Sequence, residues 1–254
     1  MLTIMTYNVH GCLGLDRRRS PARIADLIER CNPDVIALQE LDLVRRRSGF
    51  VDQAHHIAEL LGMTGHYYTT VENADGRYGG AVLSRHRLHK VKSGLLPARR
   101  STDEPRGALW VEVQRNGHAV NVLNTHLGLN RSERHLQVDS LLGSGWGAHP
   151  RFNAPAIICG DFNMTPLAQP WRKLAHNFRE VRGVSERRRR WAGTWFGVRN
   201  LDHIFVTPDV RVLDVQVLAG WQYRLASDHL PMLAVIDDRA TQTEQTEEHN
   251  PRHA

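Results

Sequence analysis

Short, nearly continuous apolar stretches recur along this chain, and several of them end in acidic, amide or imidazole side chains. Clear examples are residues 34–41 (DVIALQEL) and 154–163 (APAIICGDFN). Apolar runs of this length are typical of strands buried on both faces. Strand rims exposed to water do not require so narrow a choice of residues. The pattern therefore predicts a functional site where these strands end.

Helical patterns alternate with these strands. Residues 20–32 have apolar residues at helical spacing, with Ser20 as the expected N-cap and Pro21 at the first helical position. We expect further helices at 50–63 and at 132–143, the second capped by Ser132. Asn116-Gly117 predicts a tight hairpin turn within 108–128. We expect further strands at 2–10, 79–85, 201–208, 210–218 and 232–236. This mixed order favours two sheets with helices outside over an all-parallel barrel.

The length and composition suit one large globular domain or two small ones. The chain has 254 residues, of which 41% are hydrophobic. No repeat or linker precedes residue 238, so we predict one domain over 1–237. Residues 238–254 lack apolar periodicity and are predicted to form a disordered polar tail.

Several features bear on location. No apolar run is long enough to span a bilayer, and the N-terminal residues resemble a first strand more than a signal peptide. Cys12, Cys31 and Cys159 are widely spaced and odd in number, which predicts neither a disulfide framework nor a CxxC metal site. We therefore expect a cytoplasmic protein without stable membrane insertion, and we expect it to be a monomer.

The net charge of +6 hints at an anionic partner. Most of the 33 Lys and Arg residues are Arg, which suits bidentate phosphate contacts, although the codon bias of a G+C-rich genome is the better explanation for most of them. The runs 17–19, 45–47 and 187–190 are interpreted as solvated faces, with the border of a cleft as the alternative.

The polar strand ends share one chemical character. Carboxylates and amide oxygens suit a hard cation such as Mg²⁺ or Mn²⁺. The histidines do not have the HExxH or HxH spacing of zinc sites. The chain has no P-loop, GxGxxG or GxSxG motif. Metal-assisted hydrolysis is the chemistry that remains.

The motifs TYNVHG, ALQE, GGAVLSR, NTHL, GDFN, LDHIFV and SDHLP occur in that order over residues 2–237. This ordered set resembles the endonuclease/exonuclease/phosphatase superfamily, which has the DNase I-like fold, and in particular its general bacterial phosphodiesterase-like members. The resemblance implies an α/β fold: a four-layer α/β/β/α sandwich of two mixed, mostly antiparallel sheets with helices outside. It also implies an active site at one edge of the sheets.

Carried over to this chain, the resemblance implies metal binding by Glu40 as the principal ligand, with Asn8 beside it. Asp228 would hold the metal through oxygen or water. Because Asp228 and His229 are adjacent and both functional, the backbone there is expected to depart from ideal pleating.

The resemblance also implies the catalytic groups. Asp161 and Asn163 would position the attacking water and the phosphate, and His126 would bind the scissile phosphate or protonate the leaving oxygen. His229, oriented by Asp202, would be the base or the transition-state stabiliser. Whether Asp161 or His229 removes the proton from water stays open at this stage.

Four further residues are predicted to contact substrate, namely Asn124, Arg199, Asn200 and His10. Arg199 and Asn200 are chosen because they lie close in sequence to Asp202. His10 stands where some nucleases of the superfamily have an acid, and Asp16 is the alternative source of a carboxylate.

These residues predict a hydrolase: a phosphodiesterase or phosphomonoesterase that depends on Mg²⁺ or Mn²⁺ and uses in-line attack of water. The substrate would be a phosphorylated small molecule, a lipid headgroup or a nucleic acid. A DNA or RNA nuclease of the same superfamily is the first alternative, and a non-catalytic phosphate-binding module is the second.

Overall fold

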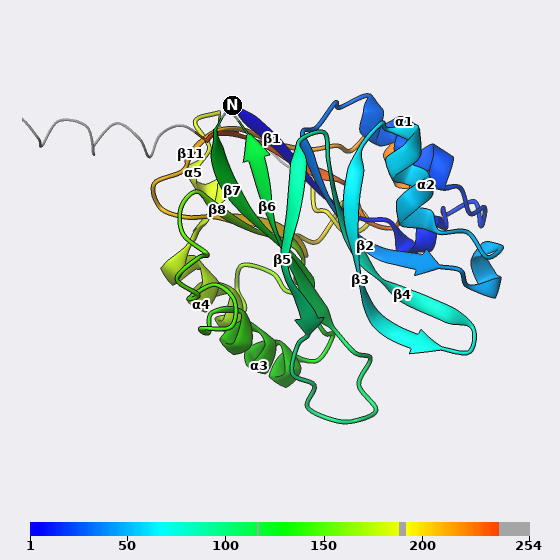
Figure 1. Ribbon diagram of the computed structural model, residues 1–254, viewed down its shortest axis with the longest axis horizontal. Coiled ribbons are helices and arrows are strands. Elements are labelled where there is room, and N and C mark those ends of the chain that lie inside the picture. Colours follow the sequence, from blue (N-terminus) through cyan, green and yellow to red (C-terminus); the bar gives the residue numbers. More distant parts are fainter. Residues whose placement is uncertain (116, 188–191, 239–254) are drawn as a thin grey trace, which may run out of the picture.

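The computed structural model describes residues 1–115, 117–187 and 192–238, which form two packed sheets with helices on both outer sides (Figure 1). The strands of the first sheet, in spatial order, are β11 (Arg211–Val217), β12 (Met232–Asp237), β1 (Leu2–Asn8), β2 (Val35–Leu43), β4 (Gly76–Ser84) and β3 (Thr64–Asn73). Those of the second sheet are β5 (Arg87–Leu95), β6 (Gly107–Arg115), β7 (His118–His126), β8 (Ala156–Asp161), β10 (Asp202–Val206) and β9 (Arg179–Glu180).

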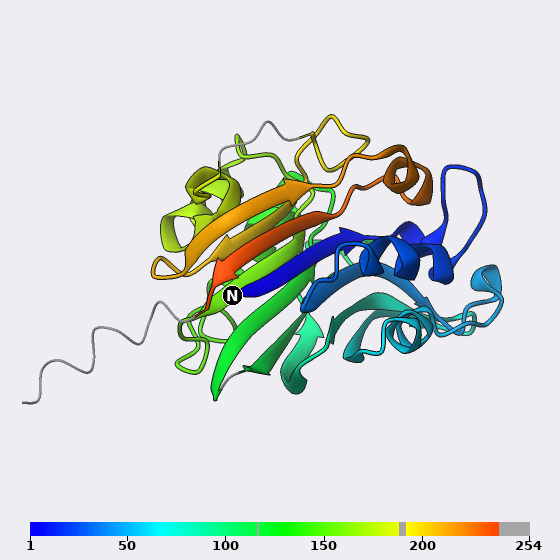
Figure 2. The same ribbon diagram turned by 90° about the horizontal axis from the view of Figure 1, so that it is seen from above.

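The helices lie outside the sheets. Figure 2 shows α1 and α2 on one side of the paired sheets and α3 and α4 on the other. The helices are α1 (Pro21–Glu29), α2 (Gln53–Leu60), α3 (Arg131–Leu141), α4 (Gln169–Asn177), α5 (Val181–Val184) and α6 (Trp221–Ala226), with short 3-10 turns η1 (His10–Cys12) and η2 (Arg46–Ser48).

The alternation of side chains along each strand produces three apolar layers. Ile4 of β1 packs between the two sheets, whereas its neighbour Met5 packs under α1 and α2. In the second sheet, Val122 faces the first sheet and Leu123 faces α3 and α4. Strands buried on both faces explain the continuous apolar runs in the sequence. The predicted α/β/β/α sandwich is confirmed.

Each sheet contains one parallel pair of strands among antiparallel neighbours. β1 runs parallel to β2, and β7 runs parallel to β8. The carboxyl ends of these four strands meet at the same edge of the sandwich. β10 and β12 are antiparallel to their neighbours β8 and β1, so their amino ends reach that edge too.

The helix caps agree in part with the sequence. Ser20 accepts a hydrogen bond from the backbone N–H of Arg23, and Pro21 begins α1, as predicted. The cap of α3 is Asn130 rather than Ser132, because Asn130 Oδ1 accepts from the backbone N–H of Ser132 at 3.0 Å. Ser132 therefore lies inside the first turn.

The ordered domain extends one residue beyond its predicted end. Asp238, predicted as the first residue of the tail, is 2% exposed and pairs with the N-terminal amine at 3.0 Å and with Arg115 at 2.6 Å. A buried carboxylate requires such partners, and they fix Asp238 beside β1. The rest of the predicted tail, 239–254, lies outside the described residues, as do Asn116 and Arg188–Arg190. Within the described residues, no helix combines the length and the hydropathy needed to traverse a membrane.

Candidate active site

Residues far apart in sequence meet at the shared strand edge. Asn8, His126 and Asp161 are the last residues of β1, β7 and β8. His126 and Asp161 lie side by side because the parallel register of β7 and β8 pairs them directly. Asp202 begins β10 opposite Asp161, since that pair of strands is antiparallel. Strand pairing thus explains why separate motifs gather here.

Glu40 reaches the same edge through an irregularity in β2. The pairing of β2 with β4 shifts register between Leu38 and Leu41, and Glu40 has a left-handed backbone with φ of 61°. Gln39 is fully buried and donates to Asn124 of the other sheet at 2.8 Å, while Glu40 lines the cavity. A non-glycine residue in this conformation is strained, which is common where a side chain is aimed for function.

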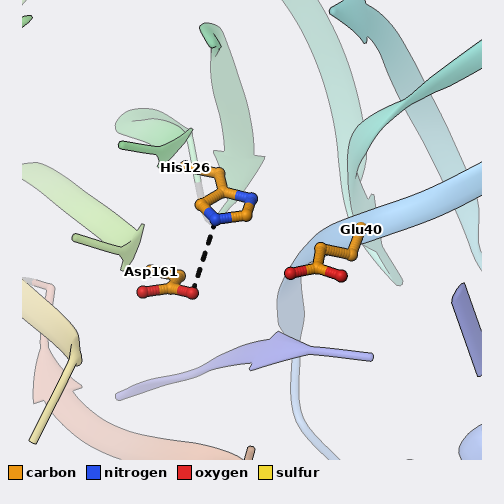
Figure 3. A group of neighbouring side chains, drawn as sticks. All are labelled: Glu40, His126 and Asp161. Carbon is orange, nitrogen blue, oxygen red and sulfur yellow. Dashed lines mark ion pairs between the residues drawn. The ribbon is translucent and has the colours of Figure 1, made fainter. Parts of the chain in front are cut away.

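Two carboxylates face each other at the centre of the site. Glu40 and Asp161 point toward one another, and the ring of His126 faces the space between them (Figure 3). The amide nitrogen of Asn8 donates to Glu40 Oε1 at 2.8 Å and to Asp161 Oδ2 at 2.9 Å. Ligand atoms of Glu40, His126 and Asp161 all lie within 4.8 Å of one another. Asn8 therefore fixes the spacing of the two acids.

His229 lies between two buried acids. Its Nδ1 is 2.7 Å from Asp202 Oδ2, and its Nε2 is 3.6 Å from Asp161 Oδ2. Burial by itself lowers the pKa of His229, but the negative charges, with Asp202 first, outweigh it and raise the pKa to about 10. Burial, reinforced by the charge of Asp202, raises the pKa of Asp161 well above its usual range. The protonation state of Asp161 and that of His229 therefore depend on each other.

Burial and a neighbouring cation both favour the neutral form of His126. Burial, together with the positive charge of Arg106, lowers the pKa of His126 well below its usual value. Asn163 donates from Nδ2 to His126 Nε2 at 3.1 Å and to the carbonyl of Leu127 at 2.9 Å. The backbone N–H of Asn163 also donates to Asp161 Oδ1 at 2.9 Å. His126 and Asn163 thus form one hydrogen-bonded unit with Asp161.

The remaining predicted metal ligand, Asp228, lies at the side of the cavity beside His10. His10 Nδ1 is 3.0 Å from Asp228 Oδ1, and this hydrogen bond raises the pKa of His10. The chain bends at Asp228, so its side chain and that of His229 reach different partners, as the adjacency of the two residues predicts.

A cavity of about 780 Å³ opens onto these groups. Its size matches pockets that enclose a whole small ligand rather than a single phosphate. Seven of the predicted site residues line it, namely His10, Glu40, His126, Asp161, Asn163, Asp228 and His229.

The structure places three predicted substrate-binding residues elsewhere. Asn124 is fully buried between the sheets, where its amide nitrogen donates to the carbonyls of Leu38 and Ala81. It links the two sheets instead of lining the cavity. Arg199 is exposed, with its guanidinium 5.8 Å from the ring centroid of Trp195, and it lines a neighbouring hollow that includes Asn163. Asn200 is half-buried in the same loop. Asp16 pairs with Arg23 at 2.7 Å, outside the cavity.

Sequence reasoning missed several supporting residues. Thr194 Oγ1 accepts from the backbone N–H groups of Leu201 and Asp202, both at 3.0 Å. Ser227 donates to the carbonyl of Asn8 at 2.9 Å, which ties the loop before β12 to β1. The SDHLP motif contains Ser227, but the sequence gives no sign of its distant partner.

Arg106 and Tyr78 were also missed. Arg106 is 8% exposed and its guanidinium lies 3.2 Å from His126 Nδ1. Burial raises the pKa of Tyr78, and Glu40 raises it further through its charge and a hydrogen bond with the hydroxyl. Neither residue follows an apolar strand, so the pattern of strand ends did not mark them.

The donor set fits a hard divalent cation. Glu40 and Asp161 bring two carboxylates together, and Asp161 is buried among other acids. Oxygen ligands of this kind are those that Mg²⁺ and Mn²⁺ prefer, and a cation here would offset the buried negative charge. The group of Glu40, His126 and Asp161 is therefore a candidate metal site.

Comparisons with known proteins indicate the family and the fold of this chain. A sequence model of the Endonuclease/Exonuclease/phosphatase family matches residues 5–229. No curated protein matches the chain.

Solved structures share the fold. An endonuclease/exonuclease/phosphatase from Bacteroides vulgatus is 19% identical with a TM-score of 0.76, covering 93% of this chain and 98% of that one. A mannosyl-6-phosphatase from Bacteroides thetaiotaomicron is 20% identical with a TM-score of 0.73, covering 93% and 100%. The human Nocturnin catalytic domain with bound sulfate is 22% identical with a TM-score of 0.72, covering 93% and 94%.

Proposed function

The chain belongs to the endonuclease/exonuclease/phosphatase family, whose members are generally metal-dependent phosphoesterases, and we propose that it hydrolyses a phosphodiester or phosphomonoester by in-line attack of water. One observation carries the proposal: Glu40, Asp161 and His229 meet at the edge of both sheets in one cavity, although they come from separate strands and loops. Asp161 and His229 are buried and have shifted pKa values, a combination that is common at catalytic sites.

We propose that Glu40 holds the divalent cation, with Asn8 fixing its carboxylate opposite that of Asp161. Mg²⁺ and Mn²⁺ are the ions that suit these oxygen ligands. When bound, the ion supplies positive charge that polarises a phosphoryl oxygen.

The protein groups would handle the proton and the phosphate. The Asp161–His229 pair accepts the proton of the attacking water, and Asp202 keeps the imidazole oriented through Nδ1. His126 and Asn163 bind a phosphoryl oxygen and orient the leaving group. Arg106 places a positive charge beside them, where charge develops in the transition state.

A nuclease of the same family is the second candidate. Arg131, Arg134 and Arg199 line a hollow that meets the main cavity at Asn163, so a strand leaving the site could follow them. Binding through such phosphate contacts would weaken steeply with salt. A non-catalytic binding module is less well supported, because such a module does not need the His229–Asp202 pair. A cytoplasmic location remains a proposal, supported by three free cysteines.

The test is hydrolysis measured with Mn²⁺ and with EDTA. The substrates are bis-p-nitrophenyl phosphate, p-nitrophenyl phosphate, plasmid DNA and a short single strand, with His229→Ala as the inactive control. Metal-dependent cleavage that the substitution abolishes supports the phosphoesterase. Preferred cleavage of DNA that falls steeply with salt supports the nuclease. If no substrate is cleaved, calorimetry with Mn²⁺ decides: tight binding indicates an enzyme with a narrower substrate, and the absence of tight binding favours the binding module.

A further inference from the structure

Three arginines gather on one wall of the cavity, away from the acidic centre. Arg19 precedes α1, and Arg45 and Arg47 follow β2, yet all three line the same cavity as Glu40 and Asp161. None of the three takes part in the chemistry proposed above.

The arginines share a buried carboxylate. The side chain of Asp42 is 0% exposed, and Arg47 donates to it from Nε at 2.9 Å and from Nη2 at 2.6 Å. Arg19 and Arg45 approach the same carboxylate at 3.9 Å and 4.0 Å. Asp42 therefore holds the three guanidinium groups together, and little conformational entropy remains to be lost when they bind a ligand.

The ion pairs of this wall contain more arginines than acids. Asp42 compensates one guanidinium, and Asp75 pairs with Arg45 at 3.1 Å, leaving three arginines against two acids. Glu104, which also lines the cavity, pairs with Arg106 at 2.9 Å. Arg19 donates to the carbonyl of Gly11, and its carboxylate partner Asp42 is 3.9 Å away. Arg45 and Arg47 each have a closer carboxylate, at 3.1 Å and 2.6 Å.

Tyr78 separates this wall from the proposed metal site. The guanidinium of Arg47 lies 5.5 Å from the centroid of the Tyr78 ring, and burial, together with the charge of Glu40 on the other side, raises the pKa of the Tyr78 hydroxyl.

We propose that Arg19, Arg45 and Arg47 form an anion subsite that binds a second anionic group of the substrate, a carboxylate or a phosphate. The proposal rests on the proposed phosphoesterase activity and adds the substrate class: a phosphoester whose non-scissile side carries another negative charge. The planar guanidinium fork matches both kinds of anion.

The test compares substrates that differ only in that charge. Each pair consists of a p-nitrophenyl carboxyalkyl phosphodiester and its methyl ester, assayed with Mn²⁺ over several linker lengths. We expect the wild type to favour the carboxylate by about tenfold in kcat/KM at the best linker, as a charge-assisted hydrogen bond supplies. Arg19→Met should remove most of that preference, and Arg19→Lys should restore much of it. Arg30→Met, which removes an exposed arginine of α1 paired with Asp26, is the matched control and should keep the preference.

A wild type without preference, or a preference that survives Arg19→Met, would overturn the proposal. If the wild type cleaves neither ester, the phosphoesterase proposal is in question instead, and binding then decides the subsite. Calorimetry at fixed free Mn²⁺ would compare 3-phosphonopropionate with propylphosphonate. The subsite is supported if the wild type binds 3-phosphonopropionate more tightly than propylphosphonate and Arg19→Met abolishes the difference. Equal binding of the two phosphonates by the wild type refutes it.

Discussion

Replacing Asp202 by Asn tests the role of the His229–Asp202 pair. The substitution keeps the shape of the side chain but removes a negative charge 2.7 Å from His229 Nδ1. In the wild type the pKa of His229 is raised from 6.5 to about 10. Asp202 contributes to this rise both by its charge and by the hydrogen bond, and it is the first of the groups that raise the pKa.

The magnitude follows from the hydrogen bond that is lost. A buried, charge-assisted hydrogen bond between an imidazole and a carboxylate contributes about 3 kcal/mol. We expect kcat/KM for bis-p-nitrophenyl phosphate with Mn²⁺ to fall by about 100-fold, since each 1.4 kcal/mol corresponds to about tenfold in rate.

The raised pKa of His229 also predicts how the stability of the metal-free protein changes with pH. A raised pKa means that the imidazolium stabilises the fold fully below pH 6.5, and that this contribution disappears as pH rises through about 10. In Asp202→Asn the loss should occur at lower pH. Titration of His229 by NMR in EDTA measures the shift directly.

Asp139→Asn is the matched control, because Asp139 is exposed and pairs with Lys173 on the helical face. It should retain wild-type activity and the wild-type titration of His229. If Asp202→Asn keeps more than a third of the wild-type kcat/KM, or leaves the titration of His229 unchanged, the reasoning about this pair is refuted.

Three further predictions concern the metal and the fold. Mn²⁺ at about 100 times its Kd should stabilise the wild type by about 2.7 kcal/mol, and Glu40→Gln should abolish the rise in Tm; a rise that persists would place the metal elsewhere. Gly160→Ala should lower Tm sharply, because Gly160 has φ of 145° and an added Cβ would lie 1.8 Å from the carbonyl oxygen of Thr125. Gly183→Ala is its control, because a Cβ added at Gly183 would meet no non-neighbouring atom within 4 Å, and it should leave Tm nearly unchanged. Asp238→Asn should lower the unfolding free energy by about 2 kcal/mol at pH 7. Although burial opposes it, pairing with Arg115 and the N-terminal amine lowers the pKa of Asp238 to about 2, so the stabilisation exists above pH 4 and disappears as pH falls toward 2. Denaturant unfolding of the wild type and the variant at pH 7 and at about pH 2 checks this. A difference in unfolding free energy between the two proteins that is the same at both pH values would contradict it.

Local patterns predicted much of the fold. Continuous apolar runs marked β1, β2 and β8, and the Ser20-Pro21 pair marked the start of α1. β3 and β5 were not predicted, because both have many exposed polar residues and lack a clean alternation. β3 lies at an edge of its sheet, as does β5, and edge strands carry a weaker sequence signal.

The sequence by itself determined the chemical character of the site, because most of the acids, amides and histidines of the site stand at or next to the end of a buried strand, and residue type is local information. Tertiary structure decided which of these groups meet. Asn8 donates a hydrogen bond to Asp161, which lies 153 positions away in sequence. Asn124 has the same side chain as Asn8, but it is buried between the two sheets and donates to a backbone carbonyl there. The left-handed backbone that aims Glu40 into the cavity depends on how β2 pairs with β4, and so does the position of Tyr78 beside it. Strand register and bulges depend on contacts between distant segments, so no local pattern contains them.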